Sequence, residues 1–290
     1  MKSDYSDIEQ LPMFRENHPS LEGFSEHFKA NISPQLKKFD DERVGKLSNA
    51  DAIIAKDIVA KNVCGFLNWA YLNAFETGPK LADFKTSNLL PYHYLWGFIQ
   101  CDPKLIYCRD LISGTITGLD FEMFKLRLDD RSGDSDAHKV TIFEGSLFRF
   151  PMKHNLSSDV LVVPDRKIFN PRRIKKMKRV GLEDPRFENK LEVYGADQVE
   201  ARALLNPGFM QTVLKFERKL EAEKVYMAFK PDCFLLGVES KQKEGFQPKN
   251  VTEHVRSMTQ FFLDEMCNVF QIVDAVMQLN GIDNPWNLKA

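Results

Sequence analysis

The sequence predicts an α+β protein with N-terminal helices, an antiparallel β meander and a long C-terminal helix. Hydrophobic residues recur every three or four positions over residues 21–39 and 251–279, which is the period of an amphipathic helix. From Asp110 onward the hydrophobic period changes to two, as in strands with one buried face. The connections between these strands are too short for crossover helices, so neighbouring strands should be antiparallel.

Length and composition predict a globular protein with a sizeable core. The chain has 290 residues, of which 43% are hydrophobic and 28% charged, and its net charge is −1. This length suits one large domain or two small ones. We expect a helical region over residues 1–88 and an α+β domain over residues 89–290. The near-neutral charge argues against a molecule built as a whole to bind nucleic acid.

A hydrophobic stretch over residues 49–75 is the one candidate for a membrane span. Charged residues interrupt its first half, and its uncharged remainder is shorter than the roughly 18–20 residues that a span needs. We therefore expect a buried core helix and no transmembrane segment. The alternative is a partner-docking helix, for which Phe66, Trp69 and Tyr71 would be suitable contacts. The first residues carry acids and no apolar stretch, so no secretory signal peptide is expected.

Cysteine usage predicts a soluble protein of the cytoplasm. The five cysteines are widely spaced, and no two form a C-x-x-C pair: Cys64, Cys101, Cys108, Cys233 and Cys267. Neither a zinc site nor a redox dithiol is indicated, so we expect reduced thiols. No nucleotide-binding glycine motif or paired histidine motif occurs, and we expect no metal and no cofactor.

The strand signals continue through the second half of the chain. They fall at residues 111–116, 121–128, 139–150, 158–163, 190–194, 224–229 and 233–240. Residues 139–150 are expected to form a strand pair bent at Glu144 and Gly145. A strand meander followed by a helix is also compatible with a pleckstrin-homology-like barrel. The helices predicted between Asp197 and Leu220 do not fit the simplest version of that fold.

Turn and cap signals are densest between residues 180 and 205. Asp184 before Pro185 predicts a short helical turn, with the carboxylate accepting from free backbone N–H groups. Asp197 with Glu200 three residues later matches a capping box. Asn206 should cap one more helix.

The same stretch, residues 183–202, offers the best candidates for acid chemistry. Its motif residues are Glu183, Asp184, Pro185, Asp197, Glu200 and Arg202. We interpret them as structural caps and ion pairs, because such networks use the residue types that also occur in catalytic sites. The stretch contains no His, Ser or Cys to act as a nucleophile or near-neutral base. The alternative is an enzyme whose acids gather only in the fold.

A basic run over residues 172–179 is the one strong charge asymmetry. Its cations are Arg172, Arg173, Lys175, Lys176, Lys178 and Arg179. The run is either a solvated loop or short helix, or an anion-binding patch for phosphate, nucleic acid or anionic lipid. Interleaved aromatic residues, which would favour stacked bases, are nearly absent.

Several of these motifs together resemble a bacterial family. They are V-G-L-E-D-P at residues 180–185, F-E at 187–188, V-Y at 193–194, D-Q-V-E-A-R at 197–202, G-S-L-F at 145–148 and V-V-P-D at 162–165. The sequence resembles the domain-of-unknown-function family numbered thirty-one thirty-seven from near Asp110 to about Ser240. The resemblance implies no catalytic residues. Family members often carry apolar spans ahead of the β-rich part, and this chain departs from that pattern.

The sequence as a whole favours a non-enzymatic binding or scaffold module. The sequence contains many signals of secondary structure and no recognised catalytic motif. The sequence does not identify its partner. The candidates are a protein and an anionic surface that contacts the basic run.

Overall fold

The computed structural model describes residues 14–42, 49–73, 105–131, 139–151, 156–165, 177–219, 223–239 and 251–279. The chain divides into two compact units. The helical unit comprises Met1–Tyr71 and Glu244–Val273, and the sheet unit comprises Leu72–Lys243 and Asp274–Ala290. The boundary predicted between residues 88 and 89 lies outside the described residues.

The helical unit begins with a helical run broken only by a change of hydrogen-bonding pattern. Its elements are η2 (Pro19–Leu21), α1 (Phe24–His27), η3 (Phe28–Ile32) and α2 (Ser33–Glu42). Phe24, Phe28, Ile32 and Leu36 recur every four residues and are buried, as the helical period predicts. Ser33 and Pro34 interrupt the helical pattern of residues 21–39 in the sequence, but the helical run continues through them. The π-helical turn η3 lies directly before them, where the missing N–H of Pro34 interrupts α-helical bonding.

Helix α3 (Asn49–Phe66) ends earlier than expected. Asn68 adopts a left-handed conformation with φ 58°, and the Trp69 N–H donates back to the Cys64 carbonyl at 2.8 Å. This is a helix-terminating arrangement that Asn tolerates better than most residues. The chain continues as strand β1 (Ala70–Asn73). Among the described residues, no helix is long and apolar enough to cross a membrane.

The long helix α9 (Val251–Leu279) confirms the predicted C-terminal helix. Its buried side chains recur at helical spacing and include Val255, Phe262, Met266, Val269 and Val273. The helix passes from the helical unit into the sheet unit between Val273 and Asp274.

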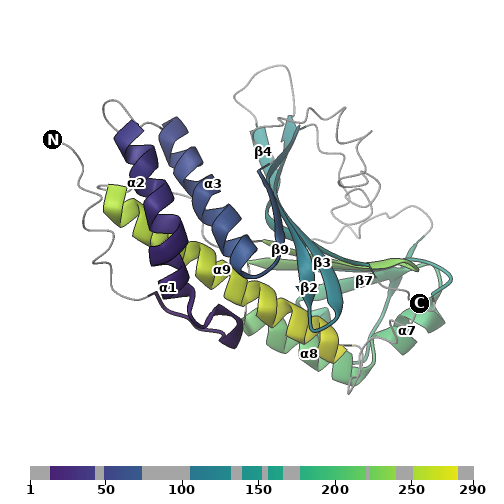
Figure 1. The fold of residues 1–290 in the computed structure, drawn as a ribbon. Helices are drawn as coiled ribbons and strands as arrows, with labels where there is room; N and C mark the ends of the chain where they lie inside the picture. The colour runs from purple at the N-terminus through teal and green to yellow at the C-terminus, as the bar shows by residue number, and fades with distance from the viewer. Residues whose placement is uncertain are drawn as a thin grey trace. The chain divides into compact units, whose positions relative to one another are not determined.

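The antiparallel sheet follows the order β1-β2-β3-β4-β9-β8-β5-β7-β6 in the described part of the chain. Figure 1 labels β2, β3, β4, β7 and β9 of this sheet. Its further strands are β2 (Leu105–Ile116), β3 (Leu119–Arg131), β4 (Lys139–Pro151), β5 (Val160–Pro164), β6 (Lys178–Val180), β7 (Leu191–Gly195), β8 (Lys224–Phe229) and β9 (Cys233–Glu239). The sheet twists strongly from β3 to β7, as sheets with right-handed strands do. The α+β fold class is thereby confirmed.

The topology departs from a simple meander after β4. Strands β2, β3 and β4 are successive hairpin neighbours as predicted, but β9 lies beside β4, and β5 lies between β8 and β7. The expected pair of strands over residues 139–150 is wrong, because β4 is one strand in which Gly145 pairs with both Leu126 and Glu239. Strands β1 and β6 form the two edges, so the described strands make an open sheet and not a closed pleckstrin-homology-like barrel.

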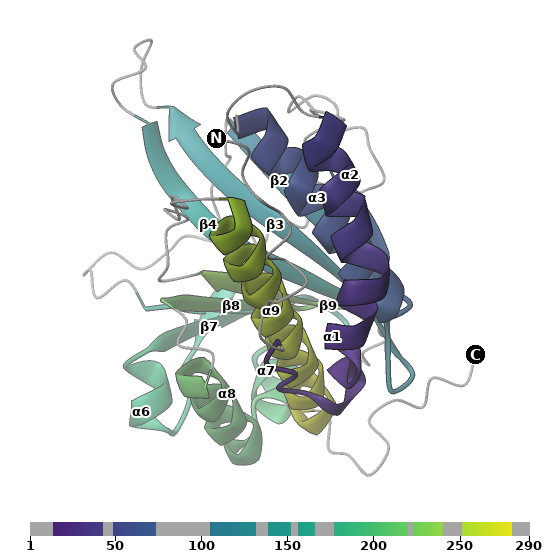
Figure 2. The same ribbon diagram turned by 60° about the vertical axis from the view of Figure 1, so that its left-hand side comes forward.

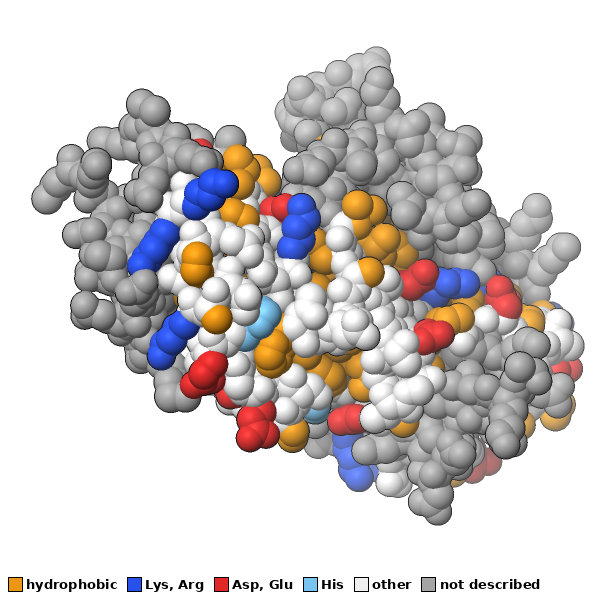
Figure 3. All heavy atoms as spheres, viewed as in Figure 1, with side chains coloured by type: hydrophobic (Ala, Val, Ile, Leu, Met, Phe, Trp, Pro, Cys, Tyr) orange, Lys and Arg blue, Asp and Glu red, His pale blue; other side chains and the backbone are white. Residues whose placement is uncertain are grey.

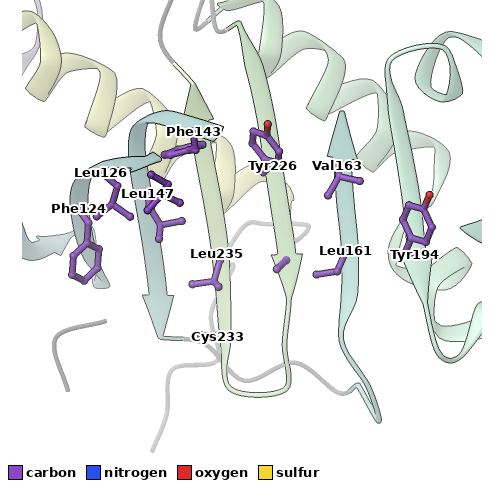
Figure 4. Close-up of a cluster of buried hydrophobic side chains, with 12 residues drawn as sticks. Phe124, Leu126, Phe143, Leu147, Leu161, Val163, Tyr194, Tyr226, Cys233 and Leu235 are labelled. Carbon is purple, nitrogen blue, oxygen red and sulfur yellow. The ribbon is translucent and has the colours of Figure 1, made fainter. Parts of the chain in front are cut away.

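The two faces of the sheet carry separate apolar layers. One face gathers a buried cluster that includes Phe124, Phe143, Leu161, Tyr194 and Tyr226, from strands β3 to β7 (Figure 4). Helix α6 (Pro185–Glu188) packs against β7 and α8 (Pro207–Lys219), and α7 (Gln198–Leu204) packs against β6 and β7; the three helices are labelled in Figure 2. The rings of Phe209 and Phe229 meet edge to face at 5.4 Å.

Candidate functional site

The predicted cap before α6 is present and is strengthened by an arginine. Asp184 Oδ1 accepts from the backbone N–H of Arg186 at 2.9 Å, and Asp184 Oδ2 lies 3.1 Å from Arg186 Nη2. The Arg186 side chain and then its backbone N–H lower the pKa of Asp184 below its usual value. The carboxylate is therefore held ionised as a helix cap.

Two further contacts fix the turn between β6 and α6. Glu188 accepts from the backbone N–H of Leu182 at 2.7 Å. Arg202 donates from Nε to the Gly181 carbonyl at 3.3 Å. Both side chains therefore satisfy backbone groups of the V-G-L-E-D-P motif.

Asp197 caps helix α7, but the predicted capping box is wrong. Asp197 Oδ1 accepts from the N–H groups of Val199 and Glu200 at 2.7 and 3.1 Å. The Glu200 carboxylate accepts from the Ser157 backbone N–H at 3.0 Å and from its hydroxyl at 2.9 Å. The long-range partner Ser157 satisfies both carboxylate oxygens, so Glu200 tethers the loop before β5 to α7.

Sequence reasoning missed the most buried acid of this region, Glu192 on β7. Glu192 is 7% exposed and accepts from the Tyr194 hydroxyl at 3.1 Å. Arg179 of β6 lies opposite Tyr194 in the sheet and approaches Glu192 at 3.9 Å. The alternation of Glu192 and Tyr194 placed both side chains on one face, but only strand pairing brings Arg179 to them.

A second acid–tyrosine group lies on the same sheet, on strands β8 and β9. Glu239 accepts from Lys224 Nζ at 3.0 Å and from the Tyr226 hydroxyl at 3.4 Å. Lys230 and Asp159 form a further close ion pair beside the β8–β9 turn. Each acid here has a cationic or phenolic donor, as buried carboxylates require.

The basic run lies partly outside the described residues. Arg172, Arg173, Lys175 and Lys176 fall in the undescribed segment, and Lys178 and Arg179 begin strand β6. The expectation of a loop or short helix is therefore wrong for these last two residues. Both are exposed on the edge strand. The view in Figure 3 shows cationic and acidic side chains interspersed over the described surface, in keeping with the near-zero net charge.

Neither a metal-ligand cluster nor an activated thiol at Cys108 is present among the described residues. No group of three His, Cys, Asp or Glu residues there could hold a metal ion. Burial, followed by the charge of Asp110, raises the pKa of the Cys108 thiol to about 12. Such a thiol is protonated at neutral pH and is a poor nucleophile.

These contacts define an α+β protein whose charged central stretch holds loops and helix ends in place. Residues 141–278 match the model of the family described as Protein of unknown function (DUF3137). The resemblance that the motifs indicate is thereby confirmed, but the matched region begins at residue 141 instead of near Asp110 and ends at residue 278 instead of about Ser240.

Comparison with solved structures gives a distant likeness. The crystal structure of the mycobacterial trehalose monomycolate transport factor A, TtfA, is similar over 73% of this chain and 93% of that chain, with 12% identity and a TM-score of 0.34. No curated protein matches the chain.

Proposed function

We propose that this protein is a non-enzymatic binding or scaffold module. The supporting observation is how the acids of residues 183–202 are engaged. Asp184, Glu188, Asp197 and Glu200 all accept from backbone N–H groups of turns and helix starts. Carboxylates in such bonds stabilise the fold by satisfying backbone donors that would otherwise lack a partner.

The competing function is an enzyme that uses these same acids. It requires two carboxylates that face a common site, with pKa values matched to proton transfer. The lowered pKa of Asp184 favours the binding module. A turnover found in a broad panel of hydrolase and transferase substrates, and abolished by both Asp184→Ala and Glu200→Ala, would contradict the proposal.

For the binding partner we propose an anionic surface that contacts the basic run. Lys178 and Arg179 are exposed on the edge strand β6, and four more cations immediately precede them in sequence. Each cation near an anionic membrane contributes on the order of 1 kcal/mol, and the attraction fades beyond a Debye length of about 8 Å at physiological salt.

Cosedimentation with vesicles tests this partner. We expect the wild type to bind vesicles of anionic lipid at low salt, to bind weakly at high salt, and not to bind neutral vesicles. The double variant Arg172→Glu/Lys176→Glu should lose this binding. The matched control Lys29→Glu/Lys215→Glu reverses two exposed cations elsewhere and should retain it. Equal sedimentation of both variants at low salt would refute the anionic partner.

We also propose a cytoplasmic location. The support is that the described cysteines Cys64, Cys108, Cys233 and Cys267 are free of disulfides, as is usual in a reducing compartment.

A further inference from the structure

A short segment ahead of the first helix is bound by the side chains of α9 within the helical unit. We call this segment, residues 14–18, the strap. The Arg15 backbone N–H donates to Gln260 Oε1 at 2.9 Å, and Gln260 Nε2 donates to the Arg15 carbonyl at 3.4 Å. The Arg15 guanidinium lies 3.1 Å from Asp264, which also accepts from Asn17 at 3.5 Å. Helix α9 therefore contacts Arg15 through both its backbone and its charged side chain.

Two rings anchor the ends of the strap. Phe14 is 8% exposed, and its ring lies 4.7 Å from that of Phe28 and 5.9 Å from that of Phe24. The ring of His18 stacks on Phe270 at 3.9 Å, with an interplanar angle of 3°. The polar contacts therefore lie between two aromatic contacts, a pattern that fixes both position and direction.

The face that holds the strap is organised by contacts of its own. We call it the docking face; it consists of Phe24, Phe28, Gln260, Asp264 and Phe270. Gln260 Nε2 donates to Asp264 Oδ1 at 2.9 Å within α9, so one turn of the helix orients both polar groups. Phe270 also packs against Trp69 at 5.2 Å. A preformed face loses little conformational freedom when a segment binds to it.

The polar contacts between the strap and α9 are ones that water can reach. The Arg15 side chain is 69% exposed and that of Asp264 is 39% exposed, and exposed ion pairs contribute little to stability. The strap also bonds to the start of α1: the Glu16 carboxylate accepts from the N–H groups of Gly23 and Ser25 at 3.0 and 2.8 Å, and the Phe14 N–H donates to Ser25 Oγ at 3.0 Å in a buried hydrogen bond. The exposed contacts with α9 open locally more easily than these more buried ones do.

We propose that the docking face is a binding site for an extended peptide with an aromatic residue, an arginine and, three residues after the arginine, a histidine. The strap is its resident occupant, and a partner segment of the same pattern displaces it. Glutamine pairing with a peptide unit recognises an extended backbone, Asp264 selects the arginine, and the two ring sites select the flanking residues. This inference names a partner class for the proposed binding module, on a different surface from the basic run.

Competition by the strap makes the proposal measurable. A tethered segment acts at an effective concentration on the order of millimolar. If the docking face binds the segment with a dissociation constant on the order of 0.1 mM, the strap lowers the apparent affinity of the face for an added peptide about tenfold. Loosening the strap should remove this suppression.

The experiment uses the full chain and a fluorescent peptide with the sequence of residues 13–20. Fluorescence anisotropy should show binding to Phe14→Ala/Arg15→Ala about tenfold tighter than to the wild type. Arg15→Ala alone should give a smaller gain in peptide affinity. Because the Arg15 side chain is exposed, this single variant still tests the proposal if the double variant misfolds. Adding Gln260→Ala or Asp264→Ala to either loosened chain should weaken binding at least to the wild-type level.

The matched control adds Asn268→Ala to either loosened chain. Asn268 is an exposed position of α9, so this change should leave peptide binding unchanged. The proposal is overturned if neither loosened chain binds the peptide better than a scrambled peptide, or if Gln260→Ala and Asp264→Ala leave binding unchanged. Vesicle binding by the wild type is measured separately, so failure of the peptide site and failure of the anionic partner are distinguishable.

Discussion

Replacing Gly145 with alanine should destabilise the sheet unit strongly. A Cβ at this position would lie 2.0 Å from the Val238 carbonyl oxygen and 3.0 Å from the Glu239 Cα, both backbone atoms of β9. Neither atom can rotate away as a side chain could. The clash is relieved only if β4 and β9 move apart where Gly145 pairs with Glu239.

The size of the effect follows from that movement. Bringing the 2.0 Å contact to a tolerable distance needs about 1 Å of separation, which stretches a ladder hydrogen bond beyond its useful length of about 3.2 Å. One or two such bonds, at about 1 kcal/mol each, add to an overpacking cost of about 1–3 kcal/mol. We expect Gly145→Ala to lower the free energy of unfolding by about 2–5 kcal/mol.

Urea unfolding followed by circular dichroism measures this loss, as a lower midpoint at an unchanged slope. Gly65→Ala is the matched control, because an added Cβ there meets nothing within 4 Å on helix α3. It should be neutral or stabilise by up to about 1 kcal/mol. A loss at Gly145 smaller than about 0.5 kcal/mol, the scale of ordinary surface changes, would refute the reasoning.

Two further predictions concern a turn and a cap. Thr117 has φ 50° in the two-residue turn between β2 and β3, where Asn is better tolerated, so Thr117→Asn should raise the unfolding free energy by about 0.5 kcal/mol; a lower urea midpoint would contradict this. The lowered pKa of Asp184 means that its stabilising effect is complete above its unfolded pKa, about 3.9, and is lost as the pH falls through the lower folded value. Asp184→Asn should therefore lower the melting temperature at pH 7 and match the wild type near pH 2, and an equal deficit at both pH values would show that the ion pair with Arg186 is not the cause.

The candidate site shows why the sequence predicted contacts between nearby residues but not contacts between residues far apart in the chain. Asp184, Asp197 and Asn206 cap helices as predicted, because a cap bonds N–H groups two or three residues away. Glu200 failed as a capping-box residue because its partner, Ser157, lies 43 positions earlier in the chain. Both arrangements use the same carboxylate chemistry, so residue type alone could not choose between them.

By itself, the sequence determined the α+β class, the helical stripes, the β2–β3–β4 hairpins and the helix caps of this protein. All of these depend on side chains a few positions apart, where backbone geometry fixes which groups can meet. The tertiary structure alone decided that β9 lies beside β4, that β5 lies between β8 and β7, and that the strap lies on α9, about 245 residues away. These pairings bring together segments distant in sequence, and they are selected by the burial of whole faces, which no local pattern encodes.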